Sequence, residues 1–132
     1  MPSRLIDDLD PRIRESAHAI RREWKAKGLD VLITCTYRSP AEQDALYAQG
    51  RTKPGPIVTQ ARAGESMHNV GLAIDFVPKI DGRVTWNDQS KLWEVIARLA
   101  QEVDSRVVWG GDWSARIRDR PHLEWRLPKE TA

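Results

Sequence analysis

The chain has 132 residues, a length typical of one domain, so we expect residues 1–132 to form a single domain around one hydrophobic core. Hydrophobic residues make up 40% of the chain and charged residues 30%, a balance that excludes a disordered or low-complexity protein. The net charge is +2, with acidic and basic side chains interspersed, so an anionic partner is permitted, and we do not expect nucleic acid binding. The single cysteine, Cys35, excludes an internal disulfide and a zinc site built from several thiolates.

The start of the chain has no basic segment followed by an apolar stretch, and no apolar run approaches the length of a membrane span. We therefore expect no signal peptide and no membrane insertion. The protein is expected to be made in the cytoplasm, so another agent must release it before it can act outside the membrane.

The first predicted elements are a helix and a strand. Asp10 and Pro11 are typical of an N-cap and a first helical position, and apolar residues then recur at helical spacing until Gly28. The β-branched segment 29–36 predicts a strand, in which we expect Cys35 to be a buried and inert thiol.

A second, shorter helix is predicted over 39–50, because this segment begins with the capping-box sequence Ser-Pro-Ala-Glu. Residues 51–65 contain several prolines and glycines and predict a long loop. We expect this loop to deliver Ser66 and His68 to a cleft.

The segment 72–77 predicts a strand with two different faces. Its alternation places apolar residues on one face, and on the other face it places Asp75 between small residues, which leaves space beside the carboxylate. A turn then leads to a predicted strand over 83–86. Asn87 or Asp88 is expected to cap the next helix.

That helix is predicted to bury five apolar residues on one face: Leu92, Val95, Ile96, Leu99 and Val103. Strands over 106–109 and 122–126 complete the chain. The predicted fold class is α+β, with a small, mostly antiparallel sheet and helices packed against it.

The most distinctive pattern is a histidine and an aspartate seven positions apart, His68 and Asp75, followed downstream by His122. Catalytic zinc usually takes three nitrogen or oxygen ligands from the protein and keeps a fourth position for water. These three side chains could therefore hold one zinc ion. Such a spacing also occurs by chance in many proteins, so the spacing alone does not decide between zinc binding and coincidence.

A zinc hydrolase also needs a base, because the bound water, whose pKa falls to about 7, must lose its proton. Asp119, three residues before His122, is the candidate for this base, although it could equally be a turn residue. A fixed positive donor stabilises the oxyanion that develops during hydrolysis. Arg38, at the end of the first strand, is the candidate for this donor, with an ordinary salt bridge as the alternative.

The tryptophans at 86, 93, 109, 113 and 125 permit a stacking surface for sugars or bases. Trp93 shares the helical spacing of the apolar face and is expected in the core. Trp113, beside two glycines, is the better candidate for a cleft residue.

Three separated motifs carry a resemblance to a known group. They are Thr-Tyr-Arg-Ser at 36–39, Ser-x-His-x-x-Gly-x-Ala-x-Asp at 66–75 and Asp-x-Pro-His at 119–122. In this order they closely resemble the zinc peptidases of the D-alanyl-D-alanine carboxypeptidase and L-alanyl-D-glutamate endopeptidase group. The resemblance covers about residues 29–126. It includes Trp-Gly-Gly-Asp-Trp at 109–113, which is similar to a loop of the phage endolysin branch.

This resemblance implies a lysostaphin-like fold, one zinc ion and hydrolysis of amide bonds in the stem peptide of bacterial peptidoglycan. Many members carry glutamate where Asp119 stands, and the shorter side chain is similar to the endolysin branch. The matching positions imply these roles: His68, Asp75 and His122 bind zinc, Asp119 is the general base, Arg38 stabilises the transition state, and Gln43 and Ser66 line the substrate cleft.

We therefore expect a monomeric zinc peptidase of phage or prophage type, an endolysin that cuts the bond between L-alanine and D-glutamate. It would accumulate in the host cytoplasm and reach the periplasmic wall after a holin breaches the membrane. One alternative is a D-alanyl-D-alanine carboxypeptidase or dipeptidase, because arginine suits the carboxylates of both kinds of substrate. The other is a wall-binding module that keeps the fold without catalysing turnover.

Overall fold

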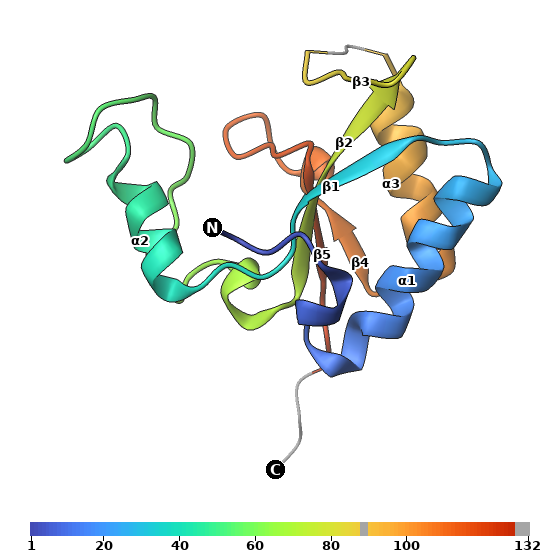
Figure 1. The fold of residues 1–132 in the computed structure, drawn as a ribbon, viewed down its shortest axis with the longest axis horizontal. Coiled ribbons are helices and arrows are strands. Elements are labelled where there is room, and N and C mark those ends of the chain that lie inside the picture. The colour runs from blue at the N-terminus through green and yellow to red at the C-terminus, as the bar shows by residue number, and fades with distance from the viewer. Residues whose placement is uncertain (88–89, 129–132) are drawn as a thin grey trace.

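A computed structural model describes residues 1–87 and 90–128 of the chain. Within these ranges it contains three α-helices, α1 (Pro11–Ala26), α2 (Pro40–Ala48) and α3 (Leu92–Val103). The strands are β1 (Val31–Cys35), β2 (Ala73–Ile80), β3 (Arg83–Val84), β4 (Val107–Trp109) and β5 (His122–Trp125), and the short 3₁₀ helices are η1 (Ile6–Asp8), η2 (Met67–Val70) and η3 (Gly110–Asp112). The predicted order of helices and strands is confirmed (Figure 1).

The first two helices begin at the predicted caps. The Asp10 side chain accepts a hydrogen bond from the Arg12 backbone at the start of α1. At the start of α2, Ser39 and Glu42 form the predicted capping box, with each side chain accepting from the other's backbone N–H. These local bonds satisfy the first N–H groups of each helix, which have no partner within the helix.

The third helix differs from the prediction at its start and on its apolar face. It begins at Leu92, whose N–H is accepted by the Ser90 hydroxyl, so Asn87 is too far upstream to cap it, and Asp88 lies outside the described residues. The helix buries Trp93, Ile96, Ala97 and Ala100, whereas two predicted core residues, Val95 and Val103, are exposed. The buried face is therefore rotated relative to the predicted one, because the large Trp93 ring takes its centre.

The sheet is antiparallel, with the strand order β1-β2-β5-β4, and β3 pairs with the far end of β2. This confirms the predicted α+β class and the mostly antiparallel sheet. β2 is longer than predicted and runs to Ile80, while β3 is limited to two residues.

The two faces of the sheet have different chemistry. On one face, α1 and α3 contact each other and cover apolar side chains of β2 and β5 (Figure 1). Phe76 packs between two tryptophans: its ring centroid lies 5.9 Å from that of Trp24 and 5.5 Å from that of Trp93. This confirms Trp93 as a core residue. Alternation along the strands turns the intervening residues of β2 and β5 to the other face, where polar side chains gather.

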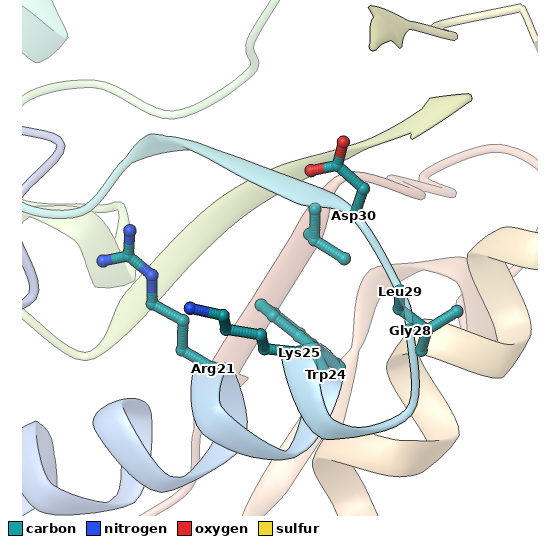
Figure 2. A pocket seen from close by; sticks show the side chains of 7 residues that line it. Arg21, Trp24, Lys25, Gly28, Leu29 and Asp30 are labelled. Atoms are coloured by element: carbon teal, nitrogen blue, oxygen red, sulfur yellow. The ribbon is translucent and has the colours of Figure 1, made fainter. Parts of the chain in front are cut away.

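A surface pocket of about 370 Å³ lies between the end of α1 and the start of β1. Figure 2 shows its lining, in which Arg21 and Lys25 extend from neighbouring turns of α1 beside the buried Trp24 ring. The pocket shares no lining residue with the cleft on the polar face of the sheet. In the described part of the chain, we find no helix with both the length and the apolar character needed to span a bilayer.

Candidate metal centre and its cleft

Three neighbouring strands bring polar side chains into one row across the sheet. The register pairs Cys35 of β1 with Asp75 of β2, and Asp75 with His122 of β5. His68 joins this row from η2: its Nε2 lies 3.0 Å from Asp75 Oδ1. His122 Nδ1 lies 3.4 Å from the same oxygen. The structure therefore brings the three predicted ligands together around the Asp75 carboxylate.

The position of His68 follows from the short helix that carries it. Ser66 caps η2 by accepting a hydrogen bond from the His68 N–H, and Gly71 ends it in the left-handed conformation, with φ 72°. The His68 Nδ1 lies 2.8 Å from the Thr36 carbonyl oxygen. Because a carbonyl can only accept, Nδ1 must carry a hydrogen, so Nε2 is the nitrogen that can bind a metal once it gives up the hydrogen that it donates to Asp75.

His122 is held by the protein through its other ring nitrogen, Nε2. Its Nε2 lies 2.8 Å from Oε1 of the buried Glu124 and donates to it, which leaves Nδ1, facing Asp75, as the nitrogen that can bind a metal. The two imidazole rings meet edge to face, with centroids 5.3 Å apart. Each histidine thus presents a different nitrogen to the same carboxylate, and each has its other nitrogen bound to the protein.

The donor types fit a zinc ion, and the two donor distances measured from Asp75 are compatible with one. In a tetrahedral site with bonds of about 2.1 Å, neighbouring donor atoms lie about 3.4 Å apart. The distances of 3.0 and 3.4 Å from Asp75 Oδ1 to the two imidazole nitrogens are close to that value. Two imidazoles and one carboxylate are also the ligand types of catalytic zinc, and a further position stays available for water.

The charges in the row are strongly coupled. Burial alone would lower the pKa of His68, but the hydrogen bonds and charges of Asp75 and Cys35 together outweigh it and raise this pKa to about 10. Burial would raise the pKa of Asp75, yet its bonds to His122 and His68 lower it well below the usual range. The carboxylate is therefore ionised and attracts positive charge to the point where the two rings meet.

Cys35 lies closer to this site than the sequence suggested. In the described part of the chain, Cys35, His68 and Asp75 form a group whose potential ligand atoms all lie within 4.8 Å of one another. The thiol is buried as predicted, but its Sγ lies 3.7 Å from His68 Nδ1 and accepts from Arg38 at 3.5 Å. Because Nδ1 is bound to the Thr36 carbonyl, the His68 nitrogen free for a metal faces away from the thiol, toward Asp75.

Arg38 lies beside the same carboxylate, with its Nη2 3.6 Å from Asp75 Oδ2. Its other terminal nitrogen donates to Gln43 Oε1 at 2.9 Å. Gln43 was predicted to line the substrate cleft, but it is fully buried behind Arg38 and is not among the lining residues. The physical reason is that its amide is already in use: Nε2 donates to the Ala61 carbonyl at 2.8 Å and so ties Arg38 to the loop after α2.

The row forms the floor of a cleft of about 750 Å³. One wall comes from the end of α2 and the loop after it, and the other from residues 113–121. The remaining predicted site residues, Ser66, Trp113 and Asp119, all line this cleft. The Trp113 ring lies 5.3 Å from the His122 ring, between centroids.

Asp119 presents a carboxylate that has no hydrogen-bond partner among the described residues. Desolvation by the cleft walls and the negative charge of Asp75 raise its pKa. Its backbone is held instead: the Asp119 N–H donates to the Gly110 carbonyl at 3.0 Å, and its carbonyl accepts from the His122 N–H at 3.2 Å. A Cβ at Gly110 would lie 2.2 Å from the Asp119 carbonyl oxygen, so only glycine permits this approach.

Sequence analysis did not single out Glu124 or Gly110. A signal for Glu124 exists in His-x-Glu, because residues two apart on a strand share a face. The role of Gly110 depends on its close contact with Asp119, nine residues further along the chain. The sequence pattern does not indicate that these two loop segments meet.

Alanine at His68 or His122 should abolish tight zinc binding, because either change leaves two of the three candidate ligands. The measurement is metal content after equilibrium dialysis of the purified protein. His18→Ala is the matched control, because His18 lies on α1, is partly exposed and pairs with Asp7. Zinc retained at full stoichiometry in both ligand variants would contradict the assignment.

Comparison with known proteins agrees with this geometry. The profile of a peptidase family described as D-alanyl-D-alanine carboxypeptidase matches residues 59–125, which include all three candidate ligands. The peptidoglycan L-alanyl-D-glutamate endopeptidase CwlK of Bacillus subtilis is 47% identical over 125 residues, covering 89% of this chain and 73% of CwlK. The L-alanyl-D-glutamate peptidase of Escherichia phage T5 is 37% identical over 54 residues, covering 39% of each chain.

The fold has relatives among solved structures. The vancomycin-resistance D,D-pentapeptidase VanY, solved in complex with Zn(II), superposes with a TM-score of 0.64 at 16% sequence identity, covering 89% of this chain and 72% of VanY. At that identity the likeness concerns the fold alone. Together with the family profile and the extended identity to CwlK, the fold leads to one conclusion: the chain belongs to the D-alanyl-D-alanine carboxypeptidase family of zinc metallopeptidases.

Proposed function

We propose that this protein is a peptidoglycan L-alanyl-D-glutamate endopeptidase that binds one zinc ion through His68, Asp75 and His122. The observation that carries the proposal is the row in which Asp75 meets both imidazoles at the floor of the cleft. The identity to CwlK, which extends over most of both chains, supports the choice of bond. The described residues pack around one hydrophobic core, which supports a single peptidase domain.

The three side chains would hold zinc at the floor of the cleft. A bound zinc ion supplies a Lewis acid, which lowers the pKa of water to about 7 and polarises a carbonyl group. The second ring nitrogen of each histidine is bound to Thr36 or Glu124, so both rings are oriented before any ion arrives. The protein therefore does not have to reorganise these side chains when it takes up the metal.

Asp119 would act as the general base. It lines the cleft, has no hydrogen-bond partner among the described residues, and its raised pKa makes it a better proton acceptor than an ordinary aspartate. It would take the proton of the attacking water and return it to the leaving amine. The Gly110 contact holds its backbone beside the row, so that the short side chain is directed into the cleft.

Arg38 would stabilise the oxyanion that forms at the scissile carbonyl. Its guanidinium lies at the cleft, and the hydrogen bond to Gln43 holds it before substrate arrives, which is how an electrostatic stabiliser gains its effect. Arg116 and Arg118 line the opposite wall. These cations suit a substrate that carries carboxylates near the bond, as the D-glutamate of a stem peptide does. Ser66 and Trp113 are the other proposed contacts with the peptide.

A digest of purified peptidoglycan tests which peptide bond the enzyme cuts. We expect new amino termini on D-glutamate, identified by mass spectrometry of the released fragments, and no release when a chelator removes the metal. Release of free D-alanine would instead support a D,D-carboxypeptidase, which the description of the matching family also names. Wall binding without either product would mean that the protein is a non-catalytic binding module.

Asp119→Ala should lower the hydrolysis rate by about 10²–10⁴-fold, because a positioned general base contributes about that much. Its zinc content should stay unchanged, because Asp119 is not a proposed ligand. The control is Asp30→Ala, which removes an exposed carboxylate near the far end of β2, paired with Lys79 at 3.9 Å. A variant at Asp119 with the wild-type rate would remove this residue from the mechanism.

The likeness to the phage T5 peptidase supports a further proposal, that the enzyme is an endolysin of phage or prophage origin. It would then stay in the host cytoplasm until a holin opens the membrane, and act on the periplasmic wall as a monomer. Expression in a Gram-negative host should lyse the cells only when a holin is co-expressed. Lysis without a holin, or intact cells with both proteins, would contradict the endolysin role. Neither result would bear on which peptide bond is cut, which the peptidoglycan digest tests separately.

A further inference from the structure

Glu124 is a buried carboxylate beside the proposed zinc site, at the floor of the cleft. It lies two residues after His122 on β5 and is only 4% exposed. Burial of an unpaired carboxylate is costly, so such a group needs partners. Both of its oxygens have one: Oε1 lies 2.8 Å from His122 Nε2, and Oε2 accepts from Arg126 Nε. The Glu124 side chain is therefore held in one orientation.

The strand register places this carboxylate beside the imidazole. His122 pairs with Asp75 across β5 and β2, and Glu124 pairs with Ala73 two residues along. Both side chains of β5 thus lie on the polar face of the sheet, and the small Ala73 leaves room for the carboxylate. The neighbouring residues Leu123 and Trp125 point into the core and are fully buried, which prevents β5 from rotating.

The carboxylate determines which ring nitrogen of His122 is available. An ionised carboxylate can only accept a hydrogen bond, so Nε2 must carry the hydrogen. Nδ1 also faces a carboxylate, that of Asp75, but at the longer distance of 3.4 Å against 2.8 Å to Glu124. When the ring is neutral, the hydrogen therefore stays on Nε2 and the lone pair is on Nδ1. In His68, the backbone carbonyl of Thr36 fixes the hydrogen on Nδ1 in the same way. Glu124 is therefore the side chain on which the tautomer of a proposed ligand depends.

We propose that Glu124 is a positioning residue that fixes His122 with its hydrogen on Nε2 and its Nδ1 lone pair toward the metal, with Arg126 holding the carboxylate in place. The inference rests on the zinc site proposed above. It assigns Glu124 no contact with substrate or with the reacting atoms. Its effect should appear in zinc affinity and in the state of the His122 ring.

Zinc affinity is measured by competition with a chromophoric chelator, using the full chain. Glu124→Ala should weaken zinc binding by about 10–100-fold, the usual effect of losing a partner of a ligating histidine. Glu124→Gln should recover part of the loss, because an amide oxygen still accepts from Nε2. Arg126→Ala should have a smaller effect than Glu124→Ala, since Arg126 acts only through Glu124.

Asp104→Asn is the control for general damage to the fold. Asp104 is also a mostly buried carboxylate and binds Arg106 and Ser16 away from the site. Its replacement should lower the melting temperature and leave zinc affinity unchanged. If both variants lose zinc affinity in proportion to their loss of stability, the role of Glu124 is structural and the proposal is wrong.

Long-range ¹H–¹⁵N NMR spectra of the metal-free wild type read the His122 tautomer directly, at a pH where the ring is neutral. We expect the hydrogen on Nε2 in the wild type and a mixture of tautomers in Glu124→Ala. A hydrogen on Nδ1 in the wild type would overturn the proposal without any variant, even if Glu124→Ala fails to fold. Wild-type zinc affinity in Glu124→Ala would overturn it as well. A wild type that binds no zinc would instead refute the proposed function, and the tautomer measurement would still stand.

Discussion

The structure of this site depends on the carboxylate of Asp75, which lies in the middle of the sheet and is shared by two imidazoles. Its Oδ1 faces His68 and His122, and its Oδ2 lies 3.6 Å from Arg38. An anion in so little water needs positive charge or hydrogen-bond donors around it, and the surrounding side chains supply both. The same arrangement suits the divalent cation that we propose to bind here. The site is therefore built around one negative charge whose position the strand register determines.

The sheet keeps the site rigid because its other face is the hydrophobic core. Along β2 and β5, residues that point to the helices are fully buried, and the residues between them carry the site. A shift of either strand by one residue would exchange the two faces and expose the core. The free energy of core packing thus holds the ligand row in register, so the geometry of the metal centre is a consequence of the fold.

Several residues that are not proposed ligands hold the site residues in position. Thr36 and Glu124 each bind the second nitrogen of a histidine, Gln43 orients Arg38, and Gly110 permits the contact that holds Asp119. Without such contacts, the side chains of the proposed ligands and base could change rotamer in solution and lose their alignment. These contacts restrict the side-chain rotamers before substrate binds. Gln43 is fully buried and contacts Arg38 without lining the cleft.

Local periodicity and motifs within a few residues were enough to predict the order of helices and strands, the caps of the first two helices and the identity of the chemical groups. His68 and Asp75 are seven positions apart, and the strand pattern indicated which way the carboxylate points. Only the tertiary structure decided that Gln43 lies behind Arg38, that Val95 faces solvent, and that Cys35 and Glu124 adjoin the ligands. These facts depend on strand register and on loops that meet across long stretches of chain, where packing and hydrogen bonding, and not local propensity, choose the partner.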